Sequence, residues 1–285
     1  EAAAAPRDPS APAAVVEALR AGDLSALPRA VKLLESGAPD HRESVADAIA
    51  SITPNSVDRD GRAKVAVAAA GAIPHLVALL KATMSDSQRQ AARALHNLTS
   101  KNVDNKTAVV EAGAIPRLLA LLKHGAPPVR EQAIGVLRNL TGGGRPENKA
   151  AVAGANAIPV LLTVLRAVEP QVQAHIAVIL YNLSNNSADR RAAVAAANGI
   201  PALVGLLAEG VPEVQREAAD TLRVLTIGSQ QLCTDLAAAG GLPPLAAMLR
   251  TADMDSKKRA GLLRDSLLKH GGRGVRAAME SAKVI

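Results

Sequence analysis

A short apolar pattern recurs five times along the chain at an almost constant interval. Each copy has a glycine or asparagine, two small or apolar residues, a proline, and then a run of mostly aliphatic residues. The prolines lie 42 or 43 residues apart, at Pro74, Pro116, Pro159, Pro201 and Pro243. A regular interval of this length is typical of stacked repeats, in which one unit cannot bury its apolar face without its neighbours.

The residue types within each copy predict how the backbone behaves there. The first position is glycine or asparagine in all five copies, and these residues tolerate the positive φ of a left-handed helix cap. Three residues later, proline suits the first turn of a helix, where a missing N–H costs nothing. The leucines that follow have helical spacing, so we expect a helix starting at each proline.

A second pattern follows the first four copies and predicts a longer helix. Its copies are residues 91–99, 133–141, 176–184 and 218–226. One position, flanked by leucines two before and one after it, holds Asn97, Asn139 and Asn182, but Val224 in the fourth copy. We expect the leucines to face inward. The marked position and the one before it are polar in most copies, so we expect them to face outward.

Together the two patterns predict an all-α solenoid of about five clear three-helix repeats with degenerate capping repeats at both ends. We expect residues 1–12, rich in alanine and proline, to be disordered, and 13–68 to form an N-terminal cap and a degenerate first repeat. Four regular repeats are expected over 69–238. A degenerate last repeat with a basic C-terminal cap or tail is expected over 239–285.

Composition narrows the classes of function. Tyr181 is the single aromatic residue, so the chain lacks the rings on which single-stranded nucleic acids stack. The single cysteine, Cys233, excludes a disulfide framework and reads as a small core residue, and no histidines or cysteines have metal-ligand spacing. We find no apolar run of the roughly 18 residues that span a membrane, no secretory signal and no catalytic motif. We therefore expect a non-catalytic protein without a cofactor or metal, in the cytoplasm or the nucleus.

The positive net charge of +7 is concentrated near the C-terminus. Residues 257–285 hold eight basic and two acidic side chains, whereas the rest of the chain is nearly balanced. One interpretation is a polar capping helix with a tail. The alternative is a surface that binds nucleic acid, anionic lipid or an acidic partner through electrostatics.

The two patterns together resemble the armadillo repeat. The clearest copy runs from Asn97 to Leu122 and includes Asn105-Lys106, a dipeptide that Asn148-Lys149 repeats. The resemblance covers about residues 24–280. The chain is most similar in character to the armadillo domains of plant-type U-box ubiquitin ligases and armadillo-only scaffolds, and more distantly to importin-alpha and beta-catenin. The resemblance implies a right-handed superhelix whose third helices line a concave groove.

The resemblance also implies a peptide-binding ladder. In importin-alpha and beta-catenin relatives, asparagines on the third helices hold the backbone of an extended peptide, and Asn97, Asn139 and Asn182 match them. An amide both donates and accepts, so it can pair with a peptide N–H and C=O together. The alternative is that these asparagines only satisfy backbone groups of the repeats. The ladder is interrupted at Ser51 and at Val224.

Importin-alpha relatives place a tryptophan four residues before each ladder asparagine. Here these positions hold Arg93, Gly135 and Val178, so the cation–π slots for lysine stems are missing. This departure counts against the alternative that the protein is an import carrier for basic signals.

The position before each ladder residue predicts an exposed, largely basic edge. The edge comprises His96, Arg138, Tyr181 and Arg223, with Arg93 added from the preceding turn. Arginine pairs bidentately with carboxylates and phosphates, so we expect acidic or phosphorylated peptides as ligands. The sequence thus predicts a monomeric interaction scaffold that holds an extended segment of a partner protein, with nucleic acid and membrane disfavoured as partners. The U-box resemblance implies the recognition part of a ubiquitin ligase.

Overall fold

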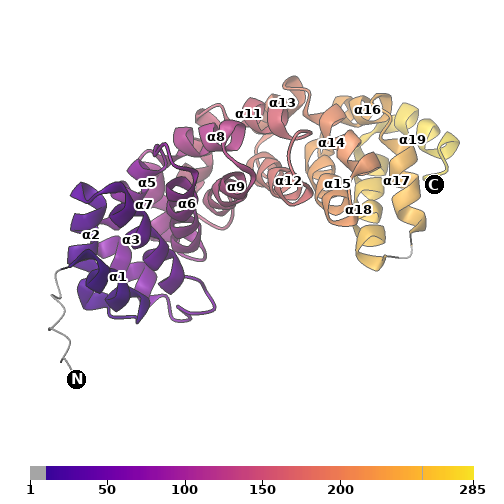
Figure 1. Cartoon of the computed structure of the whole chain (residues 1–285). Coiled ribbons are helices and arrows are strands. Elements are labelled where there is room, and N and C mark those ends of the chain that lie inside the picture. The colour runs from indigo at the N-terminus through magenta and orange to yellow at the C-terminus, as the bar shows by residue number, and fades with distance from the viewer. Residues whose placement is uncertain (1–10, 252) are drawn as a thin grey trace. The chain divides into compact units, whose positions relative to one another are not determined.

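The chain is helical in the computed structural model, which describes residues 11–251 and 253–285 and shows no β-strand within them. Most of the segment expected to be disordered, residues 1–10, lies outside the described residues. The chain divides into two compact units, Glu1–Ala155 and Asn156–Ile285, and each is described by itself. Figure 1 shows the succession of helices from α1 to α19.

The first unit contains ten α-helices and one short 3-10 helix among its described residues. The elements are α1 (Pro12–Arg20), η1 (Leu24–Ala26), α2 (Leu27–Ser36), α3 (Pro39–Ile52), α4 (Arg62–Ala69), α5 (Ala72–Leu79), α6 (Ser85–Thr99), α7 (Val103–Glu111), α8 (Ala114–His124), α9 (Pro127–Thr141) and α10 (Pro146–Gly154). The long helices α3, α6 and α9 pack side by side in one layer (Figure 1). Helix α1 covers α3 at the N-terminal end of this layer.

The second unit continues the same alternation of short and long helices. Its elements are α11 (Ala157–Val164), α12 (Pro170–Ser184), α13 (Ala188–Ala196), α14 (Gly199–Glu209), α15 (Pro212–Thr226), α16 (Gln230–Ala238), α17 (Leu242–Arg250), α18 (Met254–His270) and α19 (Gly272–Ser281). The long helices α12, α15 and α18 form the corresponding layer, and α19 packs on α16 and α18.

The left-handed caps predicted from glycine and asparagine are confirmed. All five positions have positive φ: Gly71 (81°), Gly113 (73°), Asn156 (59°), Asn198 (60°) and Gly240 (79°). In the first four copies the helix begins at the next residue, two positions before the proline that we expected to start it. The proline still lies in the first turn, where its N–H would have no partner within the helix.

The core of each unit is built from aliphatic side chains. The leucines beside the ladder positions, such as Leu95 and Leu98 on α6 and Leu137 and Leu140 on α9, are fully buried, as the pattern predicted. Cys233 is also fully buried, and burial raises the pKa of its thiol to about 11. This thiol is therefore protonated at neutral pH and behaves as a small core residue.

Two side chains of the Asn105-Lys106 dipeptide on α7 connect neighbouring helices. Asn105 is buried, and its Nδ2 donates to the carbonyl oxygens of Lys64 at 3.3 Å and Leu98 at 3.0 Å, both in the preceding repeat. Lys106 Nζ donates to the carbonyl oxygens of Gly142 and Gly143 just beyond the end of α9. The dipeptide that carries the sequence resemblance therefore has a structural role at the junction of repeats.

Neither a single-helix membrane span nor a cluster of metal ligands occurs within residues 11–251 and 253–285. No single helix there is long and apolar enough to cross a membrane; three pairs of consecutive helices reach that length and composition only together, with bends of 77–84°. The described residues also hold no group of three or more His, Cys, Asp or Glu side chains that could bind a metal ion.

Candidate functional site

The ladder asparagines of the first unit lie on the layer of long helices and are partly exposed. Asn97 on α6 donates from Nδ2 to the carbonyl oxygen of Ala50 on α3, at 2.9 Å. Asn139 on α9 donates from Nδ2 to the carbonyl oxygen of His96 and to Thr99 Oγ1 on α6, both at 3.1 Å. Each amide therefore ties its long helix to the long helix of the preceding repeat.

These bonds leave one half of each amide available. Among the described residues, no donor reaches Oδ1 of Asn97 or Asn139. The carbonyl end can accept a hydrogen bond from a ligand N–H, while the anchored NH2 group restricts rotation of the side chain. The two interpretations of the ladder, backbone satisfaction and ligand binding, are thus compatible in one side chain.

The third ladder residue, Asn182, lies in the second unit on α12. It is partly exposed, as is Tyr181 before it. The position equivalent to Asn182 in the next repeat is Val224, which is 2% exposed and belongs to the core. At the other end of the ladder, Ser51 Oγ donates to the carbonyl oxygen of Asp47 at 2.8 Å and offers no amide. The ladder therefore comprises three asparagines, two of them in one unit.

The residue four positions before a ladder position forms an ion pair on α6 in the first unit and on α15 in the second. On α6, Arg93 Nη2 lies 3.3 Å from Asp47 Oδ1 and 3.3 Å from Ser51 Oγ on α3. Asp47 also pairs with Arg20 on α1, at 2.7 Å. Arg93, which we expected to contribute a free positive charge, is therefore partly neutralised by its neighbours.

The same arrangement recurs in the second unit. Asp220 on α15 forms an ion pair with Arg259 on α18. Asp220 Oδ1 also lies 3.9 Å from Nε of Arg223, the residue expected in the basic edge. Asp220 thus lies beside the positive charge of Arg223 on the same helix, and its second pair, with Arg259, joins two helices whose residues are far apart in the sequence.

His96 is enclosed by the following repeat. Its ring packs directly on Gly135 of α9, where an added Cβ would come within 2.8 Å of His96 Cε1. Its Nδ1 lies 3.3 Å from Gln132 Oε1. Burial, reinforced by the nearby Arg138, lowers the pKa of His96, although Gln132 and Glu131 oppose the shift. His96 is therefore neutral at pH 7 and adds no charge to the surface.

Two members of the expected basic edge lie open at the surface. Arg138 on α9 is exposed and its guanidinium has no hydrogen-bond or ion-pair partner among the described residues, and Tyr181 on α12 is partly exposed. The edge carries less free positive charge than its residue types suggested, because Arg93 and Arg223 face acids and His96 is neutral. One cation on α9 and one aromatic ring on α12 remain as candidate ligand contacts.

The basic C-terminal segment is largely helical. Helix α19 buries Val275 and Met279, and α18 packs on α15 and α17. Two of its eight cations face acids, since Arg259 pairs with Asp220 and Arg264 lies 2.9 Å from Asp265. The segment thus completes the last repeat and packs against it.

Comparison with known families agrees with this arrangement. The family model for the armadillo/beta-catenin-like repeat matches residues 62–100, 102–142, 145–185 and 187–227, more than half of the chain. The chain belongs to the armadillo repeat family. Each matched armadillo unit holds two short helices and one long helix, and the ladder asparagines lie near the ends of the first three units.

Solved armadillo-type structures share the fold. An engineered protein is 30% identical, with a TM-score of 0.76, and the match covers 86% of this chain and 97% of that one. A second engineered protein is 29% identical with a TM-score of 0.83, covering 95% and 66% of the two chains. A designed armadillo repeat protein in complex with the peptide (KR)4 is 24% identical, with a TM-score of 0.73 and coverage of 84% and 98%. Among curated proteins, none matches the sequence.

Proposed function

We propose that this armadillo chain is a non-catalytic interaction scaffold, which holds an extended segment of a partner protein along its long helices. The observation that carries the proposal is the pair Asn97 and Asn139, whose NH2 groups are anchored to the preceding repeat while Oδ1 faces no donor from the described part of the chain. Anchored acceptors on successive repeats suit the N–H groups of an extended backbone, because their orientation is set before the ligand arrives.

The free charge on this surface favours an acidic or phosphorylated segment. Arg138 lies next to Asn139 and has no acidic partner among the described residues. A guanidinium in this state can bind a carboxylate or phosphate bidentately. Tyr181 offers an aromatic ring beside Asn182 for an apolar side chain of the segment. We therefore expect a ligand whose acidic group lies near the part of its backbone that Asn139 holds.

An import carrier for basic signals is the competing function. The designed armadillo protein with (KR)4 demonstrates that this fold can hold a basic peptide. In this chain, however, Arg138 repels cations, and Arg93, Gly135 and Val178 stand where import carriers have tryptophan. A Lys-rich peptide should therefore bind more weakly than an acidic peptide of the same length.

A peptide-display selection with acidic, phosphorylated and Lys-rich libraries tests the function. We expect acidic or phosphorylated peptides to bind the parent chain and not to bind the triple variant Asn97→Ala/Asn139→Ala/Asn182→Ala. The matched control is Asn105→Ala, which also removes an amide between repeats but is buried on a first helix. Asn105→Ala should lower the melting temperature and still bind the selected peptides below it.

The outcomes separate recognition from structure. Loss of binding in the triple variant together with retention in Asn105→Ala supports the ladder as a binding site. Equal binding by parent and triple variant would show that the ladder is structural only. Preference for the Lys-rich library would support the import carrier. A charge reversal, Arg138→Glu, should weaken the binding of acidic peptides by about tenfold, as is usual when a charged hydrogen bond at an interface is lost.

The cellular setting is a further part of the proposal. We propose that the module acts as a monomer in the cytoplasm or nucleus and that it serves as the recognition part of a ubiquitin ligase. This rests on the residues that resemble armadillo domains of U-box ligases. Capture of a ubiquitin-conjugating enzyme by the full-length parent would support it. Steeply salt-dependent binding of nucleic acid or anionic vesicles through residues 257–285 would favour the electrostatic alternative instead.

A further inference from the structure

A groove runs between the short helices α5 and α8 of the first unit, in the layer that does not carry the ladder. Its volume is about 520 Å³. Leu80 and Leu121 lie at its base and are almost fully buried, and Pro116 and Ala120 form an exposed part of its wall. The groove is thus an apolar furrow between two helices, open to solvent along one side.

Two cations and a histidine lie around this apolar furrow. Lys81 follows the end of α5, Arg117 is in the first turn of α8, and His124 ends α8; all three line the groove. Arg117 Nη1 donates to the carbonyl oxygen of Val77 on α5, which holds the guanidinium across the furrow. No acidic side chain is among the described residues that line it. The charge of the rim is therefore uncompensated.

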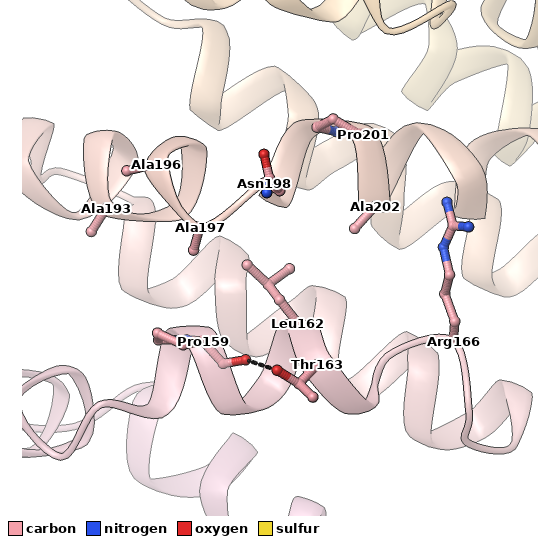
Figure 2. Close-up of a pocket in the computed structure, with 10 residues that line it drawn as sticks. All are labelled: Pro159, Leu162, Thr163, Arg166, Ala193, Ala196, Ala197, Asn198, Pro201 and Ala202. Atoms are coloured by element: carbon pink, nitrogen blue, oxygen red, sulfur yellow. Dashed lines mark hydrogen bonds between the residues drawn. The ribbon is translucent and has the colours of Figure 1, made fainter.

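Equivalent grooves in the second unit differ in charge, so the cations are not a consequence of the fold. Between α11 and α14 lies a different groove of about 780 Å³, and Figure 2 shows Leu162 of α11 between Ala197, which follows α13, and Ala202 of α14. At the positions that correspond to the α5–α8 groove, Arg166 stands for Lys81, but Ala202 replaces Arg117 and Glu209 replaces His124. Between α14 and α17 both positions are uncharged, Ala208 and Pro244, and Asp253 lines the groove.

We propose that the α5–α8 groove binds a short amphipathic helix of a partner protein that carries acidic residues on both sides of an apolar stripe. A furrow between two helices accepts the ridge of a third helix, and apolar side chains one turn apart would follow its base. Carboxylates flanking that stripe would meet Lys81 on one side and Arg117 across the furrow. The charge complementarity selects an acidic helix over a neutral or basic one.

This surface is independent of the ladder. Its lining residues lie just after α5, on α8 and directly after it, and at Gln88 in the first turn of α6, whereas Asn97 and Asn139 lie near the C-terminal ends of α6 and α9. The scaffold can therefore hold an extended segment on its long helices and an acidic helix on its short helices. Binding at one surface is expected to persist when the other is altered.

A labelled model peptide tests the proposal on the full chain. The probe has about 16 residues, or roughly four turns, with leucines at i, i+3, i+4 and i+7 and glutamates beside them. Fluorescence anisotropy measures its dissociation constant. We expect Lys81→Glu to weaken binding by about tenfold and added salt to weaken it further. The matched control is Lys123→Glu, which makes the same charge change on an exposed side chain of α8 outside the groove lining.

A second variant separates the furrow from its charge. Ala120→Arg places bulk in the groove and adds a positive charge, so binding should weaken although the electrostatic attraction rises. Tighter binding by Ala120→Arg, or equal loss in Lys81→Glu and Lys123→Glu, would overturn the proposal, because general attraction to a basic protein would then explain the data. A probe with lysine in place of glutamate should not bind. Circular dichroism confirms that each variant remains folded.

Other occupants are distinguished in the same series. When the chain sediments alone, we expect no self-association through this groove. If the chain self-associates and Lys81→Glu abolishes the association, the groove is filled by a second copy and the proposal is wrong. Binding of anionic vesicles but not of the peptide would equally overturn it. The triple ladder variant should bind the acidic helix as the parent does, and a loss there would place the peptide on the long helices instead.

Discussion

Gly135 and His96 show how a single residue changes the chemistry of a neighbour in the next repeat. His96 occupies a position that is basic or polar in other repeats, and its sequence context suggests an exposed cation. The missing Cβ at Gly135 lets the imidazole pack against α9, since an alanine there would place a methyl group 2.8 Å from the ring. The ring is thereby removed from water, and burial lowers its pKa.

The lowered pKa of His96 makes stability depend on pH. The unfolded chain binds this proton near pH 6.5, whereas the folded chain binds it only at lower pH. The stabilising contribution is therefore present above about pH 6.5 and is lost as the pH falls through the folded pKa. We expect the free energy of unfolding, measured with urea, to decrease between about pH 7 and about pH 5.5.

His96→Gln serves as the comparison for this pH dependence. Glutamine keeps a polar group at the site but has no proton to bind in this range, so the decrease should be smaller. An identical pH dependence in parent and His96→Gln would assign the effect to other titrating groups.

At the scale of elements, some side chains on the first helix of a repeat hold neighbouring repeats together. In the sequence, the same side chains only mark the repeat pattern. The Lys106 side chain on α7 reaches the carbonyls that follow α9, whereas the side chain of Lys149, at the same position on α10, has no hydrogen bond among the described residues. The carbonyl groups at the C-terminal end of a helix have no partner within it. A hydrogen bond donated to them therefore satisfies an acceptor that the helix itself leaves unpaired. Two identical dipeptides thus have different roles.

A pair of substitutions measures this difference. Lys106→Met keeps the length of the side chain but removes the donor, and we expect it to lower the free energy of unfolding by about 1–2 kcal/mol. Lys149→Met should change it by less than about 0.5 kcal/mol, as is usual at surface positions. Equal effects of the two substitutions in urea titrations would show that the contact of Lys106 with the carbonyls is not stabilising. Burial lowers the pKa of Lys106, so some cost of burying its charge is removed by methionine.

At the scale of the whole molecule, the boundary between the two compact units lies within a repeat. The third matched repeat covers 145–185, yet its first helix, α10, belongs to the first unit and packs on α7 and α9. Val152 and Asn148 of α10 are buried there. The structural unit therefore extends past the sequence repeat by one helix, because α10 covers the apolar face that α9 would otherwise leave open.

A fragment comparison tests this boundary. A fragment of residues 1–155 should be helical and unfold cooperatively, because stacked repeats derive their stability from adjacent interfaces. A fragment of residues 1–144, which ends between matched repeats, lacks α10 and should unfold at lower urea concentration. Equal midpoints for the two fragments, measured by circular dichroism, would show that α10 adds nothing to the first unit.

Much of the fold follows from local patterns in the sequence. The interval between prolines, the glycine or asparagine three residues before each, and the leucine spacing predicted the caps and the buried face. Such features depend on backbone preference and on one apolar stripe per helix, and both are encoded within about ten consecutive residues. The positions of Asn97 and Asn139 on the long helices follow from the same patterns.

The sequence alone predicted the charge available at the surface less well than it predicted the fold. Arg93, Arg223 and His96 were expected to form an exposed basic edge, but their charges are balanced by Asp47 and Asp220 or removed by burial. For Arg93 and His96 the effect joins residues about 40 positions apart, on helices that meet only after the repeats stack, whereas Arg223 and Asp220 lie on one helix. Residue type shows which charges exist, whereas distance and burial decide which of them a ligand can meet.

The periodic sequence was thus sufficient for the class of fold, the helix caps and the inward face of each helix, since those depend on contacts within a repeat. Stacking of the repeats decided which half of the Asn97 and Asn139 amides is free, that His96 is neutral, and that Lys81, Arg117 and His124 line one apolar furrow. Contacts between repeats determine how strongly each side chain is shielded from water and which residue it pairs with. These contacts cannot be read from a local pattern in a single sequence.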